Sequence, residues 1–323
     1  MQSETLAGLY VALPFAVSST MMPRVLACLC SGGLAREGES VVELITRREF
    51  GAGLLGAFAG LTLTHDRIRP SIFGGIEVGV QSYTFRAFSI DKMIEAMVSI
   101  GLSNVELWDG HLNPGKASEA DFKAIRKKFD DAGIRVGAYC VNFPVDSKDD
   151  YLDRGFNGAL LLGTNVMTAS VKKPIIPRLD QWCQKYKIKL GLHNHWFGFN
   201  GFKGDRSQEF ETPDDFANAL KGASDYLSIN LDIGHFYAAG FDPVSFIREH
   251  HRRIVSLHIK DRDKDAEHTQ RRFGQGATPI IETMKLLKKI KFKYVANIEY
   301  EPETADPTEG TRTAFEYMKR ALS

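Results

Sequence analysis

Residues 189–195 read Lys-Leu-Gly-Leu-His-Asn-His, a short apolar run that ends in three polar side chains. The length of the run and its lack of helical periodicity are typical of a β-strand buried on both faces, as in a parallel sheet. The same arrangement recurs along the chain from Ile76 onward. This repetition decides the fold.

Eight such runs alternate with stretches of helical periodicity. The predicted strands are residues 77–85, 104–108, 135–142, 165–170, 189–195, 227–233, 254–260 and 294–300. Alternating β-α units predict a parallel sheet, and a barrel of this kind takes about 250 residues. We therefore predict an α/β fold, a (β/α)8 TIM barrel, over residues 66–323. An open doubly wound sheet is the alternative, but no glycine-rich dinucleotide loop follows the first strand.

Helix boundaries are marked by capping residues and glycines. We expect Asp91 to cap a helix over 92–100 that ends at Gly101, and helices over 118–132 and 150–162 to end at Gly133 and Gly163. Later helices are predicted over residues 177–186, 213–220, 242–251, 279–290 and 307–322.

The charge balance limits the kinds of molecule that the protein can bind, and the cysteines indicate no disulfide framework. Forty-one Lys and Arg residues balance 40 Asp and Glu residues, so no general field attracts nucleic acid or an anionic membrane. A small, roughly neutral molecule is the expected ligand, and the sequence leaves open whether the barrel forms a homo-oligomer. Cys140 and Cys183 fall in apolar patterns and are predicted to be buried thiols.

Residues 1–65 are predicted to be a leader. Arg47-Arg48 precede a glycine- and alanine-rich apolar run over 51–61, a pattern that resembles a twin-arginine export signal. The run is shorter than the roughly 20 residues that span a bilayer, so no stable membrane anchor is expected. The protein is therefore expected to be periplasmic or extracytoplasmic. The alternative is a buried N-terminal helix that caps the barrel.

Polar side chains gather where the predicted strands end. In this fold the reacting groups lie at the carboxyl ends of the strands. His193, Asp232, His258 and Glu299 come from four neighbouring strands and form the predicted metal site. Imidazole together with carboxylate suits Mn, Co, Zn or Fe, with Mg also open.

Other polar and aromatic residues at the same ends complete the predicted site. We expect catalytic roles for Glu299, His193, His235 and Lys260. The predicted substrate contacts are Gln81, Tyr83, Glu106, Trp108, Asn142, His195 and Glu301.

These segments resemble the xylose isomerase-like barrel superfamily of sugar phosphate isomerases and epimerases. The resemblance covers about residues 77–321 and rests on short motifs in matching order. The motifs are Gly79-Val80-Gln81-Ser82-Tyr83, Val105-Glu106-Leu107-Trp108, Leu192-His193-Asn194-His195, Leu231-Asp232-Ile233-Gly234-His235, Leu257-His258-Ile259-Lys260-Asp261, Phe273-Gly274-Gln275-Gly276 and Ile298-Glu299-Tyr300-Glu301.

The resemblance implies that Asp232, His258 and Glu299 bind a divalent metal and that His235 contacts substrate or metal. It also exposes a departure, because His193 stands where ketose epimerases of the superfamily carry a glutamate. Those enzymes use two glutamates as bases on opposite faces of one carbon. The substitution removes one of the two bases and leaves a good metal ligand.

We expect a metal-dependent isomerase or epimerase that removes a proton next to a carbonyl of a sugar or polyol. The alternative is a metal-dependent lyase or dehydratase of a keto-sugar, an inosose or a keto-glycoside, in which His195, His235 or Lys260 supplies the acid. A non-catalytic carbohydrate-binding barrel is a further alternative. A nuclease of the related fold is disfavoured by the balanced charge.

Overall fold

The computed structural model describes residues 70–198, 204–263, 269–301 and 306–323. The predicted export signal and the predicted boundary near residue 65 lie outside these residues. Within the described ranges, no helix is long and apolar enough to cross a membrane.

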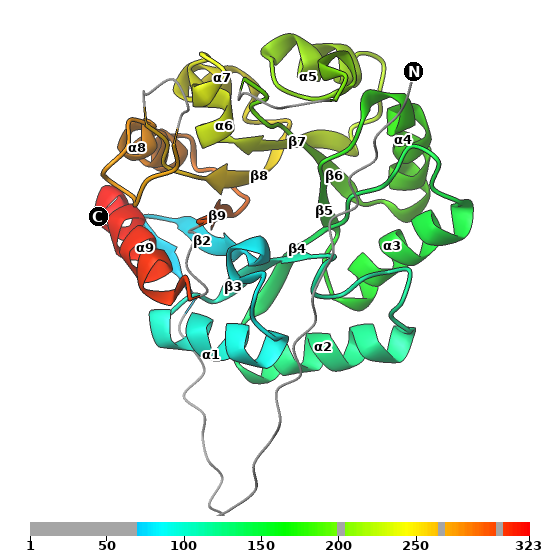
Figure 1. Cartoon of the computed structure of the whole chain (residues 1–323), viewed down its shortest axis with the longest axis horizontal. Coiled ribbons are helices and arrows are strands. Elements are labelled where there is room, and N and C mark those ends of the chain that lie inside the picture. Colours follow the sequence, from blue (N-terminus) through cyan, green and yellow to red (C-terminus); the bar gives the residue numbers. More distant parts are fainter. Residues whose placement is uncertain (1–69, 199–203, 264–268, 302–305) are drawn as a thin grey trace, which may run out of the picture. The chain divides into compact units, whose positions relative to one another are not determined.

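Eight parallel strands close into a barrel (Figure 1). Each strand pairs with the next, and β9 pairs with β2 to complete the ring. The strands are β2 (Ile76–Gln81), β3 (Asn104–Trp108), β4 (Arg135–Cys140), β5 (Val166–Ala169), β6 (Lys189–His193), β7 (Leu227–Asp232), β8 (Ile254–Ile259) and β9 (Ala296–Ile298). The predicted fold class and all eight predicted strands are confirmed.

Several strands end earlier than predicted. The first leaves the sheet at Gln81, and Ser82–Phe85 form a 3-10 helix, η1. A short strand, β1 (Ile72–Phe73), was not predicted and pairs antiparallel with β2. The chain reverses between them through Gly74 and Gly75, whose φ values of 54° and 81° favour glycine.

Helices surround the barrel in the chain order that alternation requires (Figure 1). They are α1 (Ile90–Ile100), α2 (Glu119–Asp131), α3 (Asp149–Leu161), α4 (Ile176–Tyr186), α5 (Pro213–Leu220), α6 (Ile233–Ala238), α7 (Pro243–His250), α8 (Ile280–Ile290) and α9 (Thr308–Leu322), with the 3-10 helices η2 (Lys173–Ile175) and η3 (Arg206–Gln208).

The glycine signals for helix ends are confirmed. Gly101, Gly133 and Gly163 follow α1, α2 and α3 with φ values of 92°, 74° and 85°. The predicted cap of α1 was wrong, because the side chain of Ser89 accepts the bond from Lys92 N. Asp91 lies inside the first turn instead and pairs with a lysine of α2.

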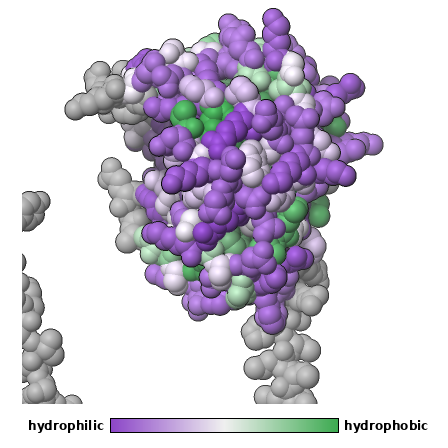
Figure 2. Space-filling model, turned by 90° about the vertical axis from the view of Figure 1, so that its right-hand side faces the viewer, coloured by the Kyte–Doolittle hydropathy of each residue, from purple (hydrophilic) through white to green (hydrophobic). Residues whose placement is uncertain are grey.

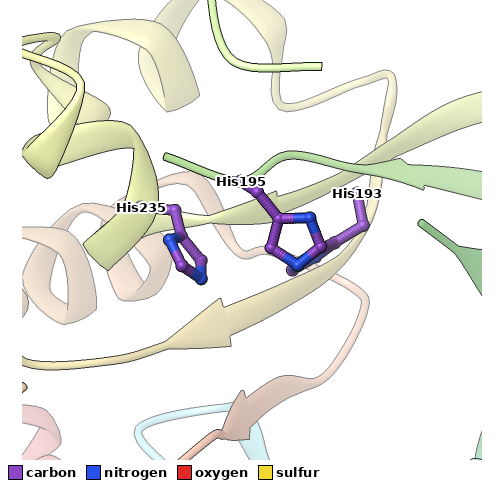
Figure 3. Close-up of side chains that lie close together, drawn as sticks. All are labelled: His193, His195 and His235. Atoms are coloured by element: carbon purple, nitrogen blue, oxygen red, sulfur yellow. The ribbon is translucent and has the colours of Figure 1, made fainter. Parts of the chain in front are cut away.

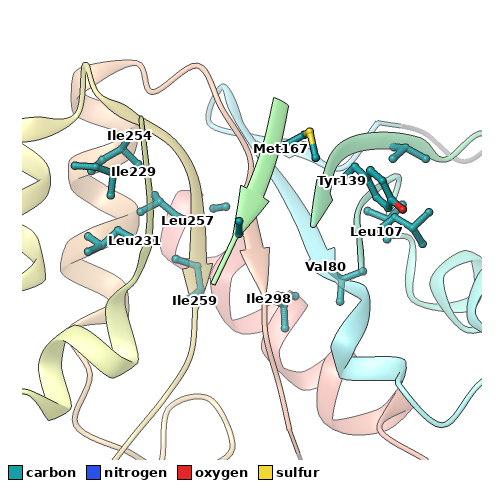
Figure 4. Close-up of a cluster of buried hydrophobic side chains, with 14 of the residues drawn as sticks. Val80, Leu107, Tyr139, Met167, Ile229, Leu231, Ile254, Leu257, Ile259 and Ile298 are labelled. Atoms are coloured by element: carbon teal, nitrogen blue, oxygen red, sulfur yellow. The ribbon is translucent and has the colours of Figure 1, made fainter. Parts of the chain in front are cut away.

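The apolar core lies between the sheet and the helices. In β7, Ile229 and Leu231 belong to this core (Figure 4). Between them, the side chain of Asn230 contacts His193 of β6 and His258 of β8. Successive strand residues face opposite sides of a sheet, so the barrel interior receives the polar half of the strand. These interior polar side chains hold the histidines at the ends of the strands.

The surface offers little apolar area. Figure 2 shows one face that is mostly hydrophilic, with small separate apolar patches. The predicted buried thiols are confirmed, since Cys140 and Cys183 are both buried and free.

Candidate metal centre and substrate pocket

The four residues predicted to bind metal converge at one end of the barrel. His193 and Asp232 are the last residues of β6 and β7, His258 lies in β8, and Glu299 directly follows β9. One ligand atom from each lies within 4.8 Å of the others, and all four residues are buried. Parallel strands bring their carboxyl ends to the same rim, which explains why residues over 100 positions apart meet.

The end of β7 is held by a neighbouring side chain. Asn194 Nδ2 donates to the carbonyl of Asp232 at 3.1 Å, and Asp232 N donates to Asn194 Oδ1 at 3.0 Å. Asp232 in turn caps α6, because its Oδ1 accepts from His235 N at 2.7 Å. Its other oxygen, Oδ2, is left facing the cluster.

The predicted role of Glu106 was wrong. We predicted a substrate contact, but the residue is completely buried and lies outside the pocket lining. Its carboxylate accepts a hydrogen bond from His258 Nε2 at 2.8 Å. Four further donors surround it, from Gln81, Thr168, Ser256 and Asn297. Glu106 thus orients His258 from inside the barrel, a carboxylate–histidine pairing typical of metal ligands.

The four-residue cluster fits a divalent cation. Asp232 Oδ2, His258 Nδ1 and Glu299 Oε2 are buried and make no hydrogen bond within the described part of the chain. Their contacts are ionic instead: His258 Nδ1 lies 3.0 Å from Glu299 Oε2, and Lys260 Nζ lies 3.1–3.3 Å from the two carboxylate oxygens. Three acceptor atoms that converge in this way can bind a cation. Because Glu106 engages His258 Nε2, the lone pair of Nδ1 faces the cluster. Two imidazoles and two carboxylates form a ligand set that Mn, Co, Zn and Fe accept.

Lys260 lies beside the cluster and does not cancel its charge. Its Nζ lies 3.3 Å from Asp232 Oδ2, 3.1 Å from Glu299 Oε2 and 3.2 Å from Glu301 Oε1. One ammonium therefore faces three carboxylates, and the local charge remains negative. Burial alone would lower the pKa of Lys260, but these three carboxylates outweigh burial and raise it.

The same charges keep Glu299 ionised. Burial by itself raises the pKa of this carboxyl, but Lys260 and His258 hold it well below its usual value. For His258 burial acts to lower the pKa, yet Glu106 and Glu299 hold it well above the ordinary value when no metal competes for the ring. A carboxylate that stays ionised is available as a ligand or as a base.

A pocket of about 380 Å³ opens above the cluster. Ten predicted site residues line it, namely Gln81, Tyr83, Trp108, Asn142, His193, His195, His235, His258, Glu299 and Glu301. Tyr83 and Trp108 meet edge to face with ring centroids 4.8 Å apart, which offers an aromatic wall to a sugar ring. Asp232, Glu106 and Lys260 lie behind this lining.

Gln81 lines the pocket with its amide already engaged. Its Nε2 donates to Glu106 at 2.7 Å and its Oε1 accepts from Tyr83 N at 3.1 Å. The residue therefore supports the pocket floor and the turn into η1.

Three histidines form a second group on the pocket wall. His193, His195 and His235 offer ring nitrogens within 4.8 Å of one another, and Figure 3 shows their rings gathered around one space. His235 is already engaged, since Trp196 N donates to its Nδ1 at 3.2 Å and Lys260 Nζ lies 3.3 Å from its Nε2. Burial is the largest cause that lowers the pKa of each ring, to about 4 for His195. These imidazoles are neutral at pH 7.

Sequence reasoning missed several residues of this region. Ser170 and Cys140 line the pocket, and Ser170 Oγ lies 3.2 Å from His195 Nδ1. Asn230 lies between two of the histidines in the barrel interior. The alternation of β7 was a usable signal for Asn230, because residues two apart share a face and Asn230 precedes Asp232 by two.

The comparisons with known proteins agree with this fold. Residues 176–321 match a family model described as xylose isomerase-like TIM barrel. A search of the curated proteins gives no match.

Solved structures resemble the whole described barrel. A sugar phosphate isomerase/epimerase from Parabacteroides distasonis is 19% identical with a TM-score of 0.60, covering 77% of this chain and 98% of its own. The probable 3-DHS dehydratase involved in petrobactin synthesis from Bacillus anthracis is 14% identical with a TM-score of 0.59, covering 76% and 97%. A xylose isomerase domain protein from Alicyclobacillus acidocaldarius is 15% identical with a TM-score of 0.61, covering 76% and 99%. The closed parallel barrel, the family match over its second half and these neighbours show that the chain has the xylose isomerase-like TIM barrel fold.

Proposed function

We propose that the protein is a metal-dependent isomerase or epimerase that removes a proton from the carbon next to a carbonyl of a sugar or polyol. The observation that carries this proposal is the convergence of His193, Asp232, His258 and Glu299 within 4.8 Å at the floor of the pocket. Three of their ligand atoms have no hydrogen-bond partner within the described ranges. A bound divalent cation would polarise the substrate carbonyl and stabilise the negative oxygen that forms.

Glu299 is the proposed base. Lys260 and His258 keep its carboxylate ionised, and it lines the same pocket as Tyr83 and Trp108, which supports contact with a sugar ring bound there. Lys260 does not line the pocket, so we assign it an electrostatic role rather than the transfer of a proton. The neutral ring of His195 is the proposed hydrogen-bond donor to a substrate oxygen, because only its Nδ1 is engaged, by Ser170, whereas both ring nitrogens of His235 have neighbours.

A lyase or dehydratase is the second candidate, and one observation favours it. The carboxylates that line the pocket in the described residues, Glu299 and Glu301, both come from the end of β9. The wall formed by β6 and α6 presents His193, His195 and His235 instead. A single carboxylate base on one face suits abstraction followed by loss of a neighbouring group. Symmetric epimerisation requires a second base on the other face.

The chemistry is tested with protein loaded with Mn²⁺ and a panel of keto-sugars and keto-glycosides in D₂O. The Glu299→Gln variant is expected to lower kcat by about 10²–10⁴-fold while the fold is retained, because the amide cannot accept the proton. Glu309→Gln makes the same chemical change on the exposed side of α9 and is expected to leave kcat unchanged.

The outcomes separate the candidates. Deuterium in an intact sugar product supports isomerisation or epimerisation, and a lost water or leaving group supports the lyase. Sugar binding without turnover on any substrate of the panel supports the non-catalytic binding protein. Full activity after metal removal, or in Glu299→Gln, contradicts the proposed mechanism.

We also propose that the protein is exported through the twin-arginine segment at Arg47-Arg48. This proposal rests on the sequence pattern alone. It is tested by N-terminal sequencing of the protein recovered outside the cytoplasm, where a product that still carries both arginines contradicts it.

A further inference from the structure

Asn230 lies at the centre of the polar interior between two of the proposed ligands. It belongs to β7, two residues before Asp232, and is completely buried. Its Nδ2 lies 3.3 Å from His193 Nδ1 and 3.2 Å from His258 Nε2. The side-chain amide therefore contacts both imidazoles, and at His258 it contacts the ring nitrogen opposite the one that faces Glu299.

The hydrogen-bond roles at this amide conflict. His258 Nε2 lies 2.8 Å from the Glu106 carboxylate, which only accepts, so the proton on Nε2 is shared with Glu106. An amide NH₂ beside that N–H places a donor against a donor. The amide oxygen, Asn230 Oδ1, is meanwhile buried without any hydrogen-bond partner within the described residues.

Rotation of the amide by half a turn about its χ2 removes the donor–donor contact, and the NH₂ group takes the buried position that Oδ1 held. The oxygen then occupies the position 3.3 Å from His193 Nδ1 and 3.2 Å from His258 Nε2, and both sites become N–H donors to it. Oxygen and nitrogen of an amide are nearly equal in size, so no other atom has to move.

We propose that Asn230 is a positioning residue whose amide oxygen faces His193 and fixes the ring as the Nδ1–H tautomer. Nε2 of His193 then carries the lone pair and is the ring nitrogen available to a cation. Glu106 does the same for His258, where it holds the proton on Nε2 and leaves Nδ1 free. This inference rests on the metal site of the proposed function and explains how His193, at the end of β6, can serve as a ligand.

The test combines zinc affinity with histidine NMR. Zinc affinity is measured by chelator competition for the wild type, Asn230→Leu, Asn230→Asp and the control Asn104→Leu. Asn104 is also a completely buried strand asparagine, but it begins β3 and bonds Glu77 at the other end of the barrel. The ¹⁵N shifts of the His193 ring, assigned with His193→Gln, are read in metal-free protein.

We expect Asn230→Leu to lower zinc affinity by about 10–100-fold, the usual effect of losing a partner behind a ligand. Asn230→Asp presents an oxygen that can only accept, so it is expected to retain affinity within about tenfold. An amide that donated to His193 would give the opposite result for Asp. Asn104→Leu is expected to change stability without changing zinc affinity.

The NMR measurement decides the case even if Asn230→Leu fails to fold. A His193 ring protonated on Nδ1 supports the inference, and a ring protonated on Nε2 in folded wild-type protein overturns it. Wild-type affinity preserved in folded Asn230→Leu also overturns it while the metal site stands. A wild type that binds no zinc, manganese or cobalt overturns the metal site itself, and the NMR result then reports on the tautomer alone.

Discussion

Glu106 shows how a single buried charge organises the floor of the site. It has no solvent exposure, yet five donors from five different residues approach its two oxygens. A carboxyl group that accepts this many hydrogen bonds is fixed in one orientation and can hold His258 in one tautomer. The residue acts through His258 and does not reach the substrate pocket.

Glu106→Gln is expected to lower zinc affinity by about 10–100-fold, because the neutral amide no longer holds the proton on His258 Nε2 with a charge. Chelator competition measures this effect. Thr168→Val removes a different donor to the same carboxylate and leaves the His258 contact intact, so its affinity is expected to stay within about threefold. Equal affinities for Glu106→Gln and the wild type would show that the pairing has no influence on the ligand.

At the scale of the elements, the ends of β6 and β7 are joined by a side chain. Asn194 follows β6 and uses its amide to bond both backbone groups of Asp232. The amide thereby extends the pairing of the two strands by one step and orients the carboxylate that caps α6. The end of β7, the cap of α6 and the proposed ligand Asp232 thus all depend on the buried Asn194.

Asn194→Ala is expected to lower the free energy of unfolding by about 2–3 kcal/mol, because the N–H and the carbonyl of Asp232 are left buried without partners. Urea unfolding of metal-free protein measures the change. Asn142→Ala is the control, since its amide also bonds a backbone N–H, of Ser170, but at an exposed position. Its expected effect is below about 1 kcal/mol, and a comparable loss in both variants would contradict the role given to Asn194.

At the scale of the whole molecule, a partly buried histidine couples stability to pH. His111 is held between η1 and β3, with its Nδ1 at 3.1 Å from Ser82 Oγ and its Nε2 at 3.2 Å from the carbonyl of Phe85. Burial lowers the pKa of this ring below its ordinary value of 6.5, against the opposing effect of the Phe85 carbonyl. His111 lies outside the proposed metal cluster, so its effect can be measured separately.

The direction of the change in stability with pH follows from proton uptake by the folded and unfolded chains. Below pH 6.5 the unfolded chain protonates His111 before the folded chain does, so stability is lost as the pH falls from 6.5 towards the lowered pKa. The fall in urea midpoint between pH 7.5 and pH 5 is expected to be smaller in His111→Gln than in the wild type, after metal removal. His251→Gln, at a partly exposed histidine in the turn after α7, is the control and is expected to follow the wild type. An unchanged pH dependence in His111→Gln would contradict the prediction.

The sequence by itself determined the barrel, its eight strands and the rim on which the site lies. These features are local: apolar runs alternate with helical periodicity, and polar residues stand at the ends of the runs. Both patterns can be recognised in the sequence alone. Position along the strands also identified the four residues that meet, because His193, Asp232, His258 and Glu299 each lie at or next to the end of a separate strand. The proposed metal and substrate remain predictions from that chemistry.

Only the tertiary structure decided which polar residues face the pocket and which face the barrel interior. Gln81, Glu106 and Asn230 come from separate strands, and their roles depend on neighbours contributed by other strands across the ring. Hydrogen bonds between residues as far apart as Glu106 and His258 are set by strand register and barrel closure. Periodicity within a single strand carries no information about either.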